Sequence, residues 1–194
     1  MLNTAGLSIE QAPPIGVPFA FFLTAPWFAA AAGLMLAWLG PGLLLTRWAP
    51  ATLAATHLIA LGFLGLVIVG ALLQLLPVLA GAPVPRVLGV SRVVYPTMVS
   101  GIIALVSGFW SSSPGLQVAA LAPIGVGVLT LAVALGLALR RAGGTVDTVR
   151  PIELAVAGLL LAAGLGATIV LALDARVGLM QLPGWVALHL SWAL

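Results

Sequence analysis

This chain of 194 residues is 62% hydrophobic and only 6% charged, with a mean hydropathy of +1.26. Soluble domains carry about 25% charged residues, so the composition excludes an ordinary soluble protein and indicates one that crosses a membrane several times. The absence of cysteine excludes disulfides, thiolate zinc sites, iron–sulfur clusters and haem attached through C-x-x-C-H within these residues. The net charge of +3 comes from scattered arginines without a basic run, so nucleic acid is not expected as a partner.

The apolar runs predict an all-α polytopic transmembrane helix bundle that forms one domain over residues 1–194. Residues 1–17 are polar enough to lie on the membrane surface as a tail. Six helices are expected after this tail, at about 18–39, 52–79, 93–110, 116–139, 151–173 and 183–194. The lipid bilayer is therefore the first partner that the sequence predicts.

Proline and glycine mark the expected limits of these helices. The Gly-Pro-Gly run at 40–42 should break the first helix, and Pro96 is expected in the first turn of the third. Pro151 suits the first position of the fifth helix. Glu153 would then lie in the first turn, where the helix dipole favours an anion.

The sixth apolar run is too short to cross the membrane by itself. Its residues, 183–194, make roughly 18 Å of helix, whereas a spanning helix needs about 20 residues. We therefore expect this helix, and the protein, to continue beyond Leu194.

The placement of the arginines predicts the orientation in the membrane. The loops on one side hold five arginines and those on the other side hold two. These are Arg86, Arg92, Arg140, Arg141 and Arg150 on the first side, and Arg47 and Arg176 on the second. The positive-inside rule assigns the richer side, and with it the N-terminus, to the cytoplasm. The expected location is the bacterial inner membrane.

The two histidines of the chain are the candidate functional residues. His57 lies about five residues into the second helix and His189 about six into the sixth, so both are expected roughly 8–9 Å below the outer interface. A titratable imidazole inside a membrane span is costly and is a functional candidate by default. Equal depth is what a shared or related cofactor requires.

Two interpretations of the histidines remain open at this point. Each can be a buried side chain that is hydrogen-bonded to a carbonyl or a hydroxyl, or each can be functional, as a metal ligand, with haem b first and copper second, or as a proton relay. If His57 is a ligand, we expect its second ring nitrogen to donate to a carbonyl or hydroxyl on a neighbouring helix. A His57 that faces lipid or merely hydrogen-bonds a carbonyl would refute the assignment as a ligand and favour a cofactor-free accessory subunit.

The other polar and sulfur-containing residues of the spans are expected to be structural. Gln74 lies about 25 Å along the helix from His57 and cannot share its site, so an inter-helix hydrogen bond is the expected role. Met35, Met98 and Met180 offer soft ligands, but packing is the expected role for all three.

The second helix resembles a known family. His57 is followed by Leu61-Gly62-Phe63, and a run from Gly70 leads to Pro77. This pattern resembles haem–copper oxidase subunit I and the NnrS-type proteins of the nitric-oxide response. The apolar opening Pro18-Phe19-Ala20-Phe21-Phe22-Leu23, with Trp27-Phe28-Ala29, is similar to the first helix of that family.

The resemblance implies a fold and a function. The chain would be the first half of a twelve-helix fold in which helices two, six and ten occupy equivalent places. By resemblance, His57 matches a low-spin haem ligand, and His189 matches the place of a copper ligand. The implied function is haem binding for electron transfer, nitric-oxide handling or copper traffic, with other membrane subunits or a redox partner. Whether the chain is an enzyme stays open.

Two other functions fit the same residues. One is a cofactor-free structural or accessory subunit of a membrane complex. The other is a small-solute or metal transporter that uses the histidines as transient ligands.

Overall fold

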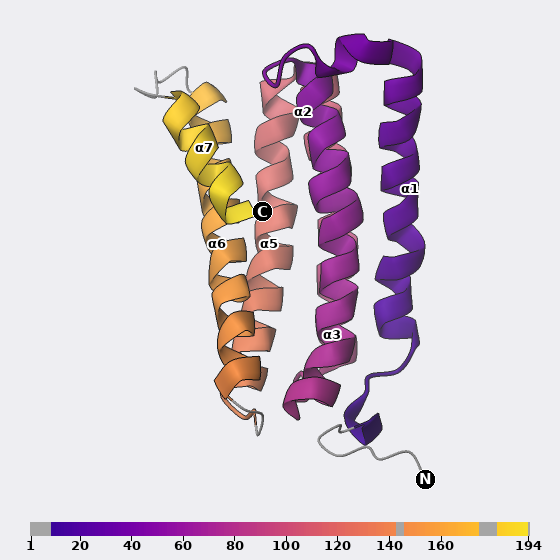
Figure 1. The fold of residues 1–194 in the computed structure, drawn as a ribbon, viewed down its shortest axis with the longest axis vertical. Coiled ribbons are helices and arrows are strands. Elements are labelled where there is room, and N and C mark those ends of the chain that lie inside the picture. The colour runs from indigo at the N-terminus through magenta and orange to yellow at the C-terminus, as the bar shows by residue number, and fades with distance from the viewer. Residues whose placement is uncertain (1–8, 143–145, 175–181, 194) are drawn as a thin grey trace.

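The computed structural model describes residues 9–142, 146–174 and 182–193, which form helices and short turns (Figure 1). The prediction of an all-α helical bundle is confirmed. The first span is α1 (Gly16–Leu39), preceded by the short η1 (Ile9–Gln11) and followed by the 3-10 turn η2 (Gly40–Leu44). The remaining single-helix elements are α4 (Val87–Trp110), α5 (Pro114–Leu139), α6 (Val146–Asp174) and α7 (Leu182–Ala193).

The second span is continuous but is built from three segments. It consists of α2 (Pro50–His57), the π-helical segment η3 (Leu58–Gly65) and α3 (Leu66–Ala80). Pro50 starts it at a position where a missing backbone N–H costs nothing, and Gly81 ends it in the left-handed region at φ 57°.

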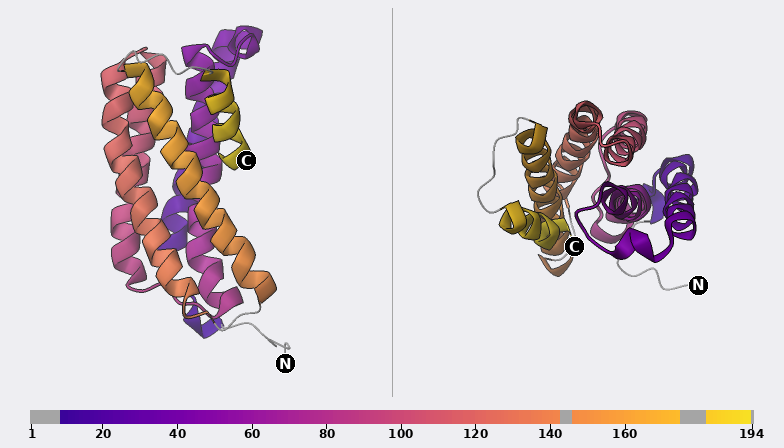
Figure 2. Two further views of the ribbon diagram at one scale, coloured as in Figure 1. Left: turned by 90° about the vertical axis from the view of Figure 1, so that its left-hand side faces the viewer. Right: turned by 90° about the horizontal axis from the view of Figure 1, so that it is seen from above.

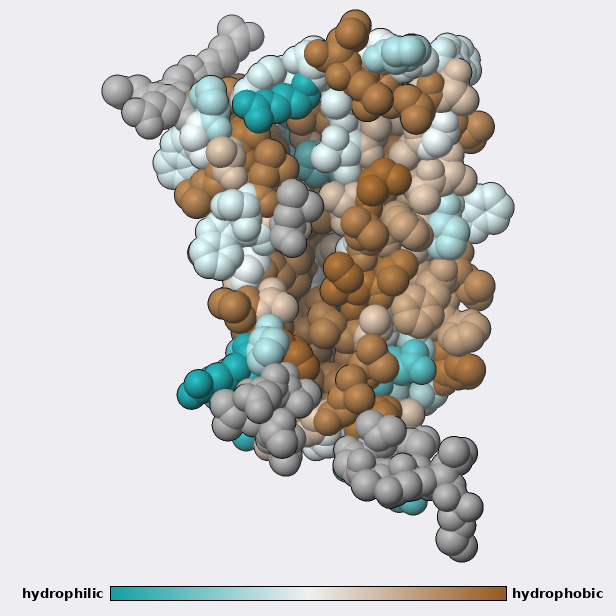
Figure 3. Space-filling model, in the orientation of Figure 1, coloured by the Kyte–Doolittle hydropathy of each residue, from teal (hydrophilic) through white to brown (hydrophobic). Residues whose placement is uncertain are grey.

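Within the residues that the structure describes, five spans are long and apolar enough to cross a membrane. They are Gly16–Leu44, Pro50–Ala80, Val87–Trp110, Pro114–Leu139 and Val149–Asp174. Apolar side chains cover the middle of the molecule in Figure 3, and most of the hydrophilic colour on that face lies towards its two ends. The chain therefore has the architecture of a multi-pass membrane protein. The sixth predicted helix, α7, has 12 residues and reaches only part of the way.

The spans follow one another around an arc (Figure 2). Consecutive antiparallel helices pack together from α4 to α7, while α1 packs against η3 and α3, and α2 packs against α4. Seen from above in Figure 2, α7 lies beside α6 on the side that faces the second span. This position brings the start of α7 to the same end of the bundle as the start of α2.

Glycines let α4 and α5 approach closely. A Cβ on Gly108 would lie 2.8 Å from the backbone nitrogen of Gln117, and one on Gly101 would lie 3.0 Å from that of Ile124. A Cβ on Gly127 would lie 2.9 Å from the Cγ of Met98. The three pairs keep one antiparallel register along both helices. Small residues at such a contact are what helix packing in membranes favours.

The second span is joined to α1 by similar contacts. A Cβ on Gly62 would lie 2.5 Å from the ring of Phe28, and one on Gly70 would lie 2.8 Å from the ring of Phe22. A polar contact links α1 to α4, where the hydroxyls of Thr24 and Tyr95 lie 2.8 Å apart.

Two predicted helix starts were wrong, and both errors have the same cause. α4 begins at Val87 instead of residue 93, so Pro96 lies in the helix interior. α6 begins at Val146 instead of residue 151, so Pro151 is also interior and Glu153 lies beyond the first turn. Proline is favoured at a helix start but does not require one, because a membrane helix can re-satisfy the carbonyl that loses its donor. The predicted break at 40–42 is confirmed, since α1 ends at Leu39 and Gly40 has φ 59°.

Candidate functional site

His57 and His189 occupy matching positions in their helices. His57 is the last residue of α2 and lies seven residues after Pro50, the first. His189 lies seven residues after Leu182, the first residue of α7. At 1.5 Å per residue, each lies about 10 Å along its helix from the same end of the bundle. The fold therefore places the two residues that the sequence singled out at one level of the bundle.

The ring of His57 is held on two sides. Its Nδ1 lies 2.8 Å from the carbonyl oxygen of Leu53, one turn earlier on the same helix. Because a carbonyl only accepts, this contact requires the proton on Nδ1. The ring also packs against Phe109 of α4, with the ring centres 4.9 Å apart and the planes 32° from parallel. We expected the carbonyl to come from a neighbouring helix, and that expectation was wrong.

A side-chain hydrogen bond fixes the start of the helix that carries His57. The hydroxyl of Thr52 donates to the carbonyl oxygen of Leu43 in η2, at 2.5 Å. The hydroxyl of Thr56 donates back to Thr52 at 2.8 Å and stays within its own helix. The first contact ties α2 to the turn that follows α1, so the depth of His57 depends on both.

A π-helical segment follows His57 directly. η3 spans 8 residues, from Leu58 to Gly65, and packs against α1. π-Helical turns are rare overall, and many of those that occur lie at functional sites. This feature was not predicted, because the apolar pattern of residues 58–65 suits any buried helix. The glycines at 62 and 65 were the only sequence signal of unusual geometry here.

His189 is held by the neighbouring helix. Its Nδ1 lies 2.9 Å from the carbonyl oxygen of Ala162 in α6, so this ring also carries its proton on Nδ1. A Cβ on Gly166, one turn further along α6, would lie only 3.1 Å from Cε1 of the imidazole. Near the end of α7, the backbone of Trp192 passes Gly158 closely enough that a Cβ there would be 3.7 Å from its oxygen. The small residues 158, 162 and 166 thus form the surface of α6 against which α7 packs. The sequence analysis did not identify this surface.

Both rings therefore offer the same free group. With Nδ1 protonated, Nε2 carries a lone pair, and among the described residues neither Nε2 has a hydrogen-bonding partner. Both side chains are half-buried. A neutral imidazole in this tautomer is the form that ligates iron, copper or zinc. The described residues contain no group of three or more His, Asp or Glu side chains that could hold a metal ion.

The remaining candidates have structural positions where the structure describes them. Met98 is buried at 4% exposure and contacts Gly127 in the α4–α5 interface, as expected for packing. Gln74 is half-buried, and no hydrogen bond of its side chain falls within the described residues, so its predicted inter-helix bond is not seen there. Met180 and Arg176 lie outside the described residues.

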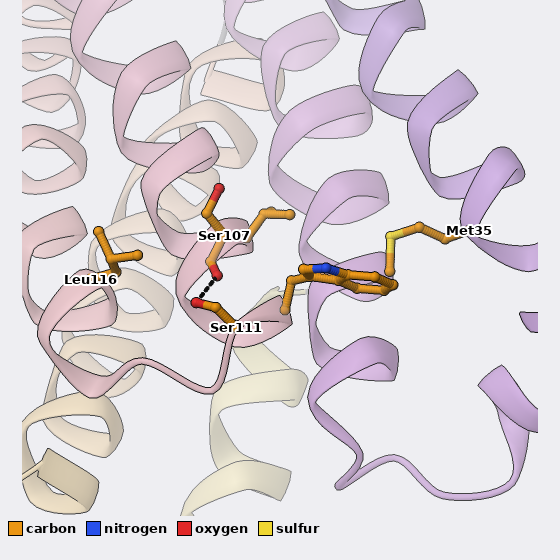
Figure 4. Close-up of a pocket in the computed structure, with 6 residues that line it drawn as sticks. Met35, Ser107, Ser111 and Leu116 are labelled. Atoms are coloured by element: carbon orange, nitrogen blue, oxygen red, sulfur yellow. Dashed lines mark hydrogen bonds between the residues drawn. The ribbon is translucent and has the colours of Figure 1, made fainter.

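A separate pocket opens between α1, α4 and α5 near the same end of the molecule (Figure 4). Its volume is about 390 Å³, and its lining is mostly apolar. The lining residues are Met35, Val106, Ser107, Trp110, Ser111 and Leu116. The hydroxyl of Ser111 is bonded to the carbonyl of Ser107 at 2.6 Å, as Figure 4 shows. Neither histidine lines this pocket.

Comparison of this chain with protein-family models, with curated proteins and with solved structures finds no match. The geometry of the two histidines is therefore the basis for a functional assignment.

Proposed function

We propose that this chain is a haem-binding integral membrane protein, related to haem–copper oxidase subunit I, in which His57 would hold the iron through Nε2. The supporting observation is the matched pair of imidazoles. Each is tethered through Nδ1 to a backbone carbonyl, and each lies seven residues into its helix at the same end of the bundle. A hydrogen bond on one ring nitrogen orients the other for a metal and raises its basicity.

The surroundings of His57 are apolar. Phe109 lies against one side of the His57 ring, and the nearby core residues Ala54 and Leu105 are apolar and buried. Haem b is the first candidate, since imidazole would hold haem iron without cysteine. Bound iron would supply one-electron chemistry, which suits electron transfer or nitric-oxide handling. Copper is the second candidate, because imidazole also ligates copper.

His189 is the second residue of the proposed site. It serves either as a partner ligand to the metal on His57 or as the ligand of a nearby second metal. The resemblance of residues 18–85 to the oxidase family supports this assignment and implies a twelve-helix protein with further subunits or a redox partner. We place the protein in the bacterial inner membrane with the N-terminus in the cytoplasm, on the basis of the five-to-two distribution of arginines.

A cofactor-free accessory subunit is the second candidate function. The favouring observation is that both histidines already have a hydrogen bond, so neither ring needs a metal to be accommodated in the bundle. A metal or small-solute transporter is the third, and it would use the same two Nε2 atoms as transient ligands.

Haem reconstitution of the full chain in detergent tests the proposal. We expect a Soret band that His57→Ala abolishes while the helical circular dichroism stays unchanged. Gln74→Ala is the matched control, since it removes a polar side chain from the same span about 25 Å away and should keep the band. An unchanged Soret band in His57→Ala would refute the ligand assignment.

Metal analysis of the same samples separates the alternatives. Stoichiometric copper that is lost in His57→Ala and His189→Ala, without a Soret band, would support the copper form. A protein that folds fully, takes up neither haem nor copper, and is as stable with alanine at both positions would support the accessory subunit.

A further inference from the structure

The ends of α4 and α5 opposite the histidines carry a cluster of exposed arginines. Three of them define what we call the arginine patch: Arg86, Arg140 and Arg141. Arg86 is the residue before α4, and Arg140 and Arg141 directly follow α5. All three side chains are exposed.

The packing of the two helices places these residues at one level. Gly127 of α5 lies opposite Met98 of α4 in the antiparallel register set by the close glycine contacts. Arg86 stands twelve residues before Met98, and Leu139 stands twelve residues after Gly127. The register therefore brings Arg86 level with Leu139, next to Arg140 and Arg141. Arg92 lies six residues further along α4, which is about 9 Å deeper.

Neither α4 nor α5 carries an acidic side chain, and Asp147, at the start of α6, is the first acidic residue that follows the patch in the sequence. The sequence has no aspartate or glutamate between Glu10 and Asp147, a stretch that contains both helices completely. Apolar side chains adjoin the arginines on the outer surface of the same helices, where Leu88 is 50% exposed and Leu137 is 42% exposed. Positive charge thus borders an apolar surface at the end of a membrane span.

We propose that the arginine patch binds the headgroup of an anionic phospholipid, with the acyl chains lying along α4 and α5. A guanidinium pairs with a phosphate through two parallel hydrogen bonds, and basic clusters at the ends of spans attract anionic lipids. The apolar surface next to the patch suits a lipid better than a soluble anion. The proposal does not depend on haem or copper.

Titration of the full chain in nonionic micelles tests the proposal, with phosphatidylglycerol and phosphatidylcholine of the same acyl chains as ligands. Native mass spectrometry counts the bound lipids. We expect preferential retention of phosphatidylglycerol that weakens with added salt. The triple variant Arg86→Gln, Arg140→Gln, Arg141→Gln should lose affinity by up to about a hundredfold, at roughly fivefold for each arginine.

Arg47→Gln is the matched control. Arg47 lies at the other end of the bundle, where its guanidinium is 5.0 Å from the ring centre of Trp48, so its loss should leave retention unchanged. Equal retention of the two lipids, or equal loss of affinity in Arg47→Gln and the triple variant, would overturn the proposal. Full displacement of the lipid by millimolar glycerol phosphate would also overturn it, because the patch would then be a site for soluble phosphate. Circular dichroism confirms that each variant is folded.

Discussion

Gly166 determines how closely His189 can lie against α6. Its missing Cβ leaves the space in which the imidazole sits, 3.1 Å from where that carbon would be. Gly164 is two residues away on the same helix, and a Cβ there would meet no atom within 4 Å. A comparison of alanine substitutions at these two glycines therefore separates the effect of helix propensity from the effect of contact with the histidine.

We predict that Gly166→Ala is less stable than Gly164→Ala by about 1–2 kcal/mol, because crowding at the ring offsets the gain in helix propensity. Thermal unfolding in detergent measures the difference. In a haem-loaded sample, Gly166→Ala should also shift the absorption spectrum, whereas Gly164→Ala should not. Equal stability of the two variants would show that the contact with α6 at Gly166 places no constraint on the imidazole of His189.

The hydroxyl pair of Thr24 and Tyr95 is the polar contact between α1 and α4. Tyr95→Phe removes the hydrogen bond and keeps the ring, which packs edge-on against Phe21 with centres 5.4 Å apart. Hydrogen bonds between membrane helices contribute about 0.6 kcal/mol on average, so a loss of that size is expected. A double-mutant cycle with Thr24→Val measures it, and additive effects of the two changes would contradict the contact.

At the scale of the helices, the α4–α5 pair is distinguished by glycines at which the two helix backbones approach each other closely. Gly108→Ala would place a Cβ 2.8 Å from the backbone nitrogen of Gln117, and backbone cannot move aside as a side chain can. We expect a loss of about 1–3 kcal/mol in the free energy of unfolding. Gly136→Ala on α5 is the control, because nothing lies within 4 Å of its added carbon. Denaturant unfolding in mixed micelles compares the two, and equal losses would argue against the close contact.

The number and order of the helices could be predicted from the sequence, because apolar runs bounded by glycine and proline carry that information directly. The positions of the two histidines along their helices could also be predicted, since they follow from counting residues from the helix start. The interior positions of Pro96 and Pro151 could not, because proline's preference for helix starts is only statistical.

The contacts of the site were less accessible to prediction. The sequence shows that His57 needs a partner, but it does not show whether Leu53 or another helix supplies the carbonyl. The packing of α7 on α6 depends on which face of each helix contacts the other, and the apolar pattern of a membrane helix does not distinguish these faces. Lipid-facing and protein-facing positions are both apolar here.

At the scale of the whole molecule, the alternation of spans predicts which ends share a side of the membrane. Gly115 in the first turn of α5 and Ala142 beyond its end lie at opposite ends of a helix of 26 residues. Single cysteines at these positions can be labelled without background, because the chain has no cysteine of its own.

We predict that a thiol reagent that cannot cross the membrane labels Gly115→Cys in intact cells. Ala142→Cys should react only after the membrane is permeabilised, because its end of the bundle carries the arginine-rich loops. Labelling of both from outside would refute the span assignment. The reverse pattern would keep the spans and invert the orientation.

The π-helical segment rotates α2 about the axis of the second span, relative to α3, compared with a continuous α-helix. A π-turn holds about one residue more than an α-turn, and one residue corresponds to about 100° of rotation. α3 is fixed against α1 at Gly70, so the extra residue in η3 sets the direction in which His57 points. Deleting one residue from 58–65 would return this segment to α-helix and turn the imidazole away from Phe109. Two chains with the same histidine and the same flanking glycines can therefore differ in whether they form this site, through a length difference of a single residue.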